Sequence, residues 1–273
     1  MRINWPGLAK LAGGVLFVLL GQVAHAAEKI VLTGSSTVAP LVAEIGKRYE
    51  ERNPGVRVDV QSGGSSRGIS DARAGLADIG MVSRALNNDE ADLDAYEIAR
   101  DGIGIIVHRD NKVPSLSDSQ IIGIYTGRTR DWRAVGGNAG QITVVNKAEG
   151  RSTLELFLHH FKLKASDIKA SVVIGDNQQG VKTVAGNRGA IGYVSIGTAE
   201  YEHGAGTAIR LLGMGGIAAS VENVRNGSYP LARPLNLVTK AEPSGRVKDF
   251  IAFTRSAAVH DLIAEQFFVA ASP

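Results

Sequence analysis

The 273-residue sequence contains no cysteine, no run of clustered lysine and arginine, no internal repeat and no low-complexity segment. The absence of cysteine excludes disulfide bonds and any anchor attached to a lipid-modified cysteine. The absence of a basic cluster argues against nucleic acid as a partner, because such binding depends on concentrated positive charge. The chain is long enough for one large domain or for two lobes of ordinary size.

The most apolar segment lies at the N-terminus, where Arg2 and Lys10 precede the run Leu11 to Leu20. Ala24-His25-Ala26 then fits the small-x-small cleavage rule, so residues 1–26 are predicted to be a signal peptide and the mature chain to begin at Ala27. A transmembrane helix is the alternative, although the run is short for a bilayer. We expect a soluble periplasmic protein with no membrane anchor.

The charge balance supports the same interpretation. Residues 1–26 hold two of the 30 basic residues and none of the 27 acidic ones, so the mature chain carries a formal charge of +1. The sequence pI of about 9.1 therefore reflects the signal peptide in part, and does not indicate nucleic-acid affinity.

Strand and helix patterns alternate in the first part of the chain. Apolar residues at helical spacing predict an amphipathic helix over 38–49, and Pro54 follows its end. The other expected elements are strands at 29–33, 56–61 and 77–82 and a short helix at 66–74. This order predicts a parallel sheet with right-handed crossovers.

The same pattern restarts after about Asp110. We expect extended runs at 102–108, 142–145, 190–194 and 234–238, with helices at 121–125, 153–161, 181–185, 247–253 and 257–268. Two such units predict an α/β protein of two lobes, one formed by residues 27–105 plus 233–273 and the other by 106–232. A ligand is then expected at the carboxyl ends of the strands.

Three short segments rich in glycine and hydroxyl residues each open an expected helix. They are Gly34-Ser35-Ser36-Thr37, Ser62-Gly63-Gly64-Ser65-Ser66-Arg67-Gly68 and Gly150-Arg151-Ser152-Thr153. Such a turn offers free backbone N–H groups, the positive end of a helix dipole and hydroxyl donors. Three of them, two with an arginine, predict a pocket that surrounds a small tetrahedral oxyanion.

Other interpretations of these segments remain open. Each turn alone fits an ordinary helix cap or a glycine-rich connection. Gly64 to Gly68 also matches the G-x-S-x-G nucleophile elbow, which would make Ser66 the nucleophile of a secreted serine hydrolase with His260 as its base. His159 and His160 are adjacent and do not share a helix face, so we expect no metal site, and no segment predicts a cofactor.

The chain resembles the substrate-binding protein of the high-affinity phosphate ABC transporter. The matching segments are Thr33 to Pro40, Ser62 to Ile69, Ala77 to Arg84, Gly150 to Phe157, Gly189 to Val194 and Tyr229 to Leu235. The resemblance implies a type II periplasmic binding protein fold, in which two α/β lobes joined by two crossing strands close over the anion. It also implies inorganic phosphate as ligand, an ABC transporter permease as partner, a monomer and no catalysis.

Carried over by motif, the resemblance gives a set of expected phosphate-binding residues. They are Ser36, Thr37, Val38, Ser65, Ser66, Arg67, Ser83, Arg84, Arg151, Ser152 and Thr153, with Asp78 and Lys147 as further candidates. Thr37 and the N–H of Val38 would act from the first turn, and Ser65 from the second. Ser152 and Thr153 would act from the third, and Arg151 or Lys147 would supply positive charge.

The sequence departs from the family pattern in two places. The best-known members of the family carry an aspartate near the end of the third strand, which accepts the proton of a protonated phosphate, whereas this chain has Ser83-Arg84 there and Asp78 earlier. The third motif begins at Lys147 rather than at an arginine. We expect the acceptor to be a serine hydroxyl, a backbone carbonyl or Asp78. Sulfate or molybdate binding, and a phosphate sensor or adhesion protein, remain as alternatives.

Overall fold

The structure, a computed structural model, describes Met1 and residues 28–271. The segment that carries the predicted signal peptide, and its cleavage site, lie outside the described residues. Within the described part of the chain, no helix is long and apolar enough to cross a membrane.

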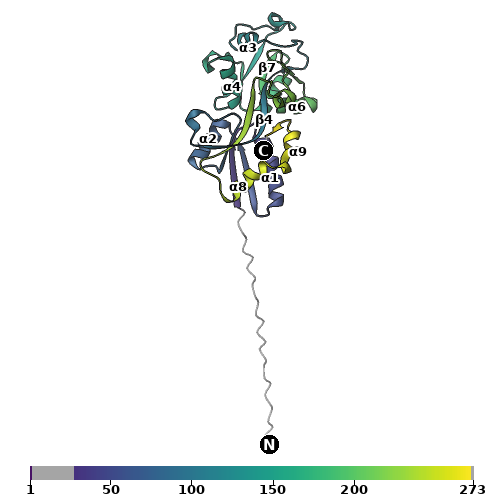
Figure 1. Cartoon of the computed structure of the whole chain (residues 1–273). Helices are drawn as coiled ribbons and strands as arrows, with labels where there is room; N and C mark the ends of the chain where they lie inside the picture. Colours follow the sequence, from purple (N-terminus) through teal and green to yellow (C-terminus); the bar gives the residue numbers. More distant parts are fainter. Residues whose placement is uncertain (2–27, 272–273) are drawn as a thin grey trace.

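The first lobe is built on three parallel strands, β1 (Glu28–Gly34), β2 (Val56–Ser62) and β3 (Ile79–Val82), in the order β2-β1-β3. Helices α1 (Ala39–Arg52) and α2 (Ser65–Ala74) connect them, as the alternating pattern predicts. The predicted apolar face of α1 is buried, and Pro40 lies in its first turn, where its missing N–H costs nothing. Helices α8 (Gly245–Thr254) and α9 (His260–Glu265) complete this lobe (Figure 1).

The second lobe contains β5 (Thr143–Lys147), β6 (Val172–Ile174), β7 (Ala190–Ser195) and β8 (Ile209–Leu212). Strand β5 pairs in parallel with both β6 and β7. Its helices are α3 (Asp118–Tyr125), α4 (Ser152–Phe161), α5 (Asn177–Ala185), α6 (Ile196–Gly204) and α7 (Val221–Arg225). Its largest apolar core includes the stacked rings of Phe157 and Tyr193, whose centroids are 4.1 Å apart.

Two long antiparallel strands, β4 (Asp94–His108) and β9 (Ala232–Thr239), run between the lobes (Figure 1). They join the two sets of strands in the order β2-β1-β3-β9-β4-β7-β5-β6. Strand β4 contributes Ile98 and Ala99 to the core of the first lobe, and Ile103 and Ile105 to that of the second. The site described below lies around this crossing.

Some of the expected elements differ from those observed. The sheet is mixed, because β9 pairs antiparallel with β3 and β4. The extended run expected at 102–108 is only the second half of β4. The helix expected at 257–268 is a 3-10 turn (Ala257–Val259) followed by α9, after which Phe267 takes a left-handed φ of 55° and β10 (Val269–Ala270) pairs with β4. Phe268 is thereby buried in the core of the first lobe.

Candidate anion-binding site

The guanidinium of Arg233 joins the two lobes where the long strands cross. Its side chain is only 1% exposed. Nη1 donates to Thr153 Oγ1 at 3.1 Å and to Ser83 Oγ at 3.3 Å, and Nη2 donates to Thr37 Oγ1 at 3.2 Å. One arginine on β9 therefore holds hydroxyls from the end of β3, the start of α1 and the first turn of α4.

These contacts restrict where the hydroxyl hydrogens can point. A hydroxyl that accepts a hydrogen bond from an arginine, which has no acceptor, cannot donate its own hydrogen back to that arginine. The O–H groups of Thr37, Ser83 and Thr153 are therefore free to donate elsewhere. A cluster of three directed hydroxyls beside a buried cation favours a ligand that carries several acceptor oxygens and negative charge.

Asp101 on β4 supplies the counter-charge for Arg233. Its Oδ2 accepts from Arg233 Nη2 at 2.9 Å and from Nε at 3.3 Å, and its Oδ1 accepts from the N–H of Gly197 at 3.3 Å. Both side chains are 1% exposed, and a charge buried to this extent needs a paired partner. The carboxylate of Asp101 is therefore part of the framework that holds Arg233.

The second predicted turn packs against the start of α4 in the other lobe. Ser65 Oγ accepts from the N–H of Ser83 at 3.2 Å, while the N–H of Ser66 donates to Gly150 O at 3.3 Å. Gly64 has a φ of 101°, and a Cβ there would lie 2.5 Å from Gly150 O. Only glycine permits both this conformation and this close approach of the two lobes.

A network of ion pairs around Arg84 lies next to the second turn and the start of α4. Arg84 is buried and donates to both oxygens of Glu90, at 2.6 and 2.8 Å, and to Glu155 Oε2 at 2.6 Å. Glu155 Oε1 accepts from Ser66 Oγ at 3.2 Å. Burial by itself lowers the pKa of Arg84, but the hydrogen bonds to Glu90 and the charge of Glu155 outweigh it and raise the pKa. Glu155 belongs to α4, so these contacts connect the two lobes.

The third predicted turn brings polar groups that lack partners among the described residues. Arg151 Nε and Ser152 Oγ are buried, and neither makes a hydrogen bond to any described residue. A buried donor without a partner costs about 1–3 kcal/mol, so such groups need an explanation. A bound oxyanion between the lobes would supply the missing acceptors.

The side chain of Lys147, at the end of β5, is linked to Thr37 of the first turn by hydrogen bonds through the side-chain amide of Asn177. Its Nζ donates to Asn177 Oδ1 at 2.9 Å, and Asn177 Nδ2 donates to Thr37 Oγ1 at 3.1 Å. Lys147 is 3% exposed. Burial lowers its pKa to about 7; the charge of Asp176 opposes this shift, and those of Arg233 and Arg151 add to it.

Two of the predicted site residues lie outside this arrangement. The exposed guanidinium of Arg67 pairs with Asp71 at 3.0 Å and with Gln61 at 3.1 Å. Exposed Asp78 accepts the N–H of Val31 at 2.8 Å and so joins β3 to β1. Neither side chain contacts the group around Arg233.

Ser36 and Val38 stay close to the first turn. Ser36 lines a cavity of about 390 Å³ together with Asn177. The N–H of Val38 donates to Ser35 Oγ at 3.4 Å, a long contact that would leave this N–H available to a better acceptor.

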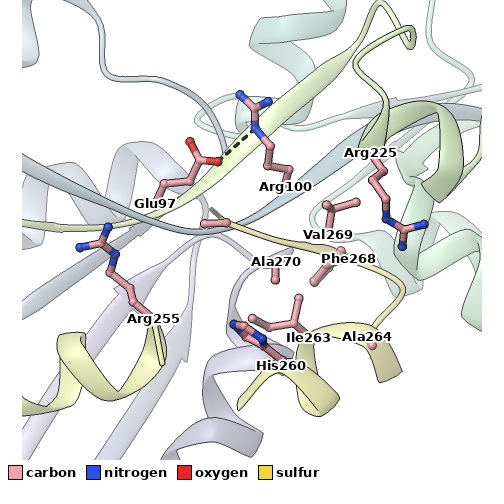
Figure 2. A pocket seen from close by; sticks show the side chains of 11 residues that line it. Glu97, Arg100, Arg225, Arg255, His260, Ile263, Ala264, Phe268, Val269 and Ala270 are labelled. Atoms are coloured by element: carbon pink, nitrogen blue, oxygen red, sulfur yellow. Dashed lines mark ion pairs between the residues drawn. The ribbon is translucent and has the colours of Figure 1, made fainter. Parts of the chain in front are cut away.

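His260, the expected base of the hydrolase alternative, lies in a different cavity. Figure 2 shows this cavity of about 700 Å³, which His260 lines together with Arg100, Arg225 and Arg255. Ser66 does not line it, and its hydroxyl donates to Glu155. The structure does not bring the expected nucleophile and base together.

Comparison with known proteins identifies the family of the chain. The model of the PBP superfamily domain matches residues 21–258. The chain belongs to the PBP superfamily.

Several proteins of known structure or function are similar to this chain. A solved structure of a putative phosphate ABC transporter substrate-binding protein from Clostridium perfringens, with bound phosphate, is 31% identical with a TM-score of 0.83; the match covers 90% of this chain and all of that one. An ABC-type phosphate transport receptor from Vibrio cholerae is 30% identical with a TM-score of 0.74, over 89% of this chain and all of that one. The phosphate-binding protein PstS of Bacillus subtilis is 27% identical over 236 residues, which are 85% of this chain and 76% of the relative. The predicted fold class and family resemblance are confirmed.

Four residues of the site in this PBP superfamily member escaped the sequence-based prediction: Arg233, Asp101, Asn177 and Glu155. Arg233 lies between Pro230 and Pro234 in an otherwise apolar segment, and Asp101 precedes the apolar run 102–107. A charged residue within an apolar strand pattern is a usable signal, because burial of a charge needs a partner.

Proposed function

We propose that this protein binds inorganic phosphate between its lobes and delivers it to the permease of an ABC importer, without catalysis. The observation that carries the proposal is the convergence of Thr37, Ser83 and Thr153 on one buried arginine, beside the unpartnered donors of Arg151 and Ser152. The names of the relatives support phosphate as the anion.

The proposal includes closure of two lobes around the ligand. We assign residues 27–105 plus 233–273 to one lobe and 106–232 to the other. The separate apolar cores support two lobes, with Ile103 and Ile105 of β4 packing in the core of the second. Strands β4 and β9 would act as the hinge. The contacts of Ser66, Arg84 and Asn177 across the cleft correspond to the closed state.

The proposed location is the periplasm, with the protein exported as a monomer after cleavage behind Ala26. N-terminal sequencing of periplasmic material should begin at Ala27. A mature protein that retains the run Leu11 to Leu20 would overturn this location.

Isothermal titration calorimetry tests the ligand. The mature protein is unfolded, refolded to remove carried-over ligand, and titrated with phosphate, sulfate and molybdate. Phosphate should bind with clear preference over the other two. Equal or tighter binding of sulfate or molybdate would assign the site to a different oxyanion, and no binding of any of them would reject the proposal.

The absence of catalysis has its own test. The hydroxyl of Ser66 donates to Glu155 and does not face a histidine, which supports a binding role. Esterase activity of the wild-type protein and of Ser66→Ala should both equal the background rate. A robust hydrolytic rate that the substitution abolishes would instead support the hydrolase alternative.

A further inference from the structure

The two sides of the cleft are closed in different ways. On the side of α2 and α4, Glu155 accepts hydrogen bonds from Arg84 and Ser66 of the other lobe. On the side of α1 and α5 there is a cavity of about 390 Å³. The residues that line it include Ser36, Asn177, Thr198, Tyr201 and Gln266. Because Asn177 also donates to Thr37, this cavity adjoins the group around Arg233.

Two exposed aromatic side chains meet beside this cavity, one from each lobe. Tyr201 belongs to α6 of the second lobe and is 51% exposed, while Phe267 follows α9 of the first lobe and is 37% exposed. Their ring centroids are 6.5 Å apart and their planes are inclined by 74°, an edge-to-face arrangement that is attractive in itself. Figure 1 shows α6 and α9 on the same side of the molecule. The pair is a direct contact between the lobes outside the anion site.

The backbone of Phe267 has a conformation that bulky residues rarely adopt. Its φ is 55°, and its N–H and that of Phe268 donate to Ala264 O at 2.9 Å and Ile263 O at 3.1 Å. This is a Schellman ending of α9, in which glycine is the usual residue at the left-handed position. An aromatic residue there is under strain, and strained positions of this kind often carry a function.

The segment after α9 contacts both lobes near the hinge. Phe268 is buried in the core of the first lobe, and Val269 packs against that of the second. The ring of Phe268 also lies against Gly197, where a Cβ would be 2.6 Å from Phe268 Cε1, and the N–H of Gly197 donates to the hinge strand β4. Tyr201 is one turn farther along α6. Rotation of the lobes about the hinge should therefore separate Tyr201 from Phe267 first.

We propose that Tyr201 and Phe267 form a latch that stabilises the closed state and slows the release of bound phosphate. This inference rests on the proposed function. The latch is made in the closed protein and does not include the anion-binding groups, so its loss should increase the dissociation rate. Association begins from the open state, in which the rings are apart, and should be nearly unaffected.

The variant Phe267→Gly removes the ring and lets the backbone keep its left-handed φ without strain. Stopped-flow measurements should show phosphate dissociation about three to ten times faster, with a nearly unchanged association rate. The matched control is Lys162→Gly, because exposed Lys162 ends α4 with a φ of 54° and is remote from the latch in the sequence. It should change neither rate. An unchanged dissociation rate in Phe267→Gly would overturn the inference.

A double-mutant cycle tests whether the two rings act together. Tyr201→Ala should raise the dissociation rate by about the same factor as Phe267→Gly, and the double variant should release phosphate no faster than either single variant. If each residue were merely structural, the two effects would add. Additive effects, or a slower association rate in either variant, would argue against the latch.

The absence of cysteine from the chain allows the contact itself to be followed. In the double variant Tyr201→Cys with Phe267→Cys, a short reagent that alkylates two thiols joins the lobes only when these positions are close. Cross-linking should be faster with phosphate than after its removal. The cross-linked, loaded protein should then release phosphate at least about tenfold more slowly, because opening is prevented. Each single-cysteine variant, treated with the same reagent, serves as control.

Two results of the cross-linking would overturn the latch. One is an equal rate of cross-linking with and without phosphate, which would mean that the contact persists in the open state. The other is an unchanged release of phosphate from the cross-linked protein. Failure of the wild-type protein to bind phosphate in calorimetry would instead reject the proposed function.

Discussion

Asp101 and Arg233 face each other in register on the two strands that cross between the lobes, and Arg233 Nη2 donates to Asp101 Oδ2 at 2.9 Å. Strand pairing therefore fixes the position of the buried cation before any ligand arrives. The guanidinium also donates hydrogen bonds to hydroxyls of both lobes, those of Thr153 and Thr37. Removal of either partner should disturb the fold and the site together.

The substitution Asp101→Asn keeps the shape of the side chain and removes its charge. It leaves Arg233 buried without a counter-ion, so the free energy of unfolding should fall by about 3–5 kcal/mol. Urea denaturation without phosphate measures this change. The control Asp59→Asn breaks the exposed ion pair with Lys29 and should cost no more than about 1 kcal/mol. Equal effects of the two substitutions would contradict the framework role of Asp101.

Arg151→Ala should weaken phosphate binding by roughly tenfold or more. The buried Nε has no partner among the described residues, and a hydrogen bond to a charged group contributes about 1.5–3 kcal/mol. Titration calorimetry gives the dissociation constant. Arg67→Ala serves as control, because that guanidinium is exposed and paired with Asp71, and binding should be unchanged. If Arg151→Ala binds as tightly as the wild type, Arg151 does not reach the anion.

Glu155→Gln should make phosphate leave the cleft faster. The carboxylate of Glu155 on α4 holds Arg84 and Ser66 of the other lobe, so its charge stabilises the closed state. We expect a dissociation rate about tenfold higher and a nearly unchanged association rate, measured by stopped-flow fluorescence. Glu149→Gln removes the same charge from an exposed position and should change neither rate. A change confined to the association rate would argue against a role in closure.

Lys147→Met should stabilise the ligand-free protein, most strongly at low pH. Burial lowers the pKa of Lys147 from 10.5 to about 7, so the unfolded chain binds more protons than the folded one between these values. Wild-type stability should therefore rise with pH through that window, and the variant should show a flatter profile. At pH 6 we expect a gain of about 2–4 kcal/mol, since one pKa unit corresponds to about 1.36 kcal/mol. Urea denaturation from pH 6 to 10 tests this, and a loss of stability at pH 6 would contradict it.

The features that the sequence predicted well are local ones. The apolar spacing of α1 is visible within 14 residues, and each hydroxyl turn is complete within a few positions. The turn around Gly64 follows directly from a strand and opens a helix, so its place at the edge of the sheet could be inferred. Two α/β units then followed from the order of the elements, whereas the two crossing strands were implied by the family resemblance.

The centre of the site could not be predicted in the same way, because its contacts are distant in the sequence. Arg233 is 196 residues from Thr37, 150 from Ser83 and 80 from Thr153, and only the crossing of β4 and β9 brings them together. Arg67, by contrast, was an expected ligand although Asp71 lies four residues later on the same helix. That spacing indicates a local ion pair, and the structure shows it.

The most direct test of the account is the position of the anion itself. Arsenate has the shape and protonation of phosphate, and its anomalous scattering locates it without ambiguity in a crystal of the mature protein. We predict one peak between the lobes, with oxygens within hydrogen-bond distance of Thr37, Thr153 and Arg151. A peak confined to the cavity of Arg100, Arg225, Arg255 and His260, shown in Figure 2, would contradict the account.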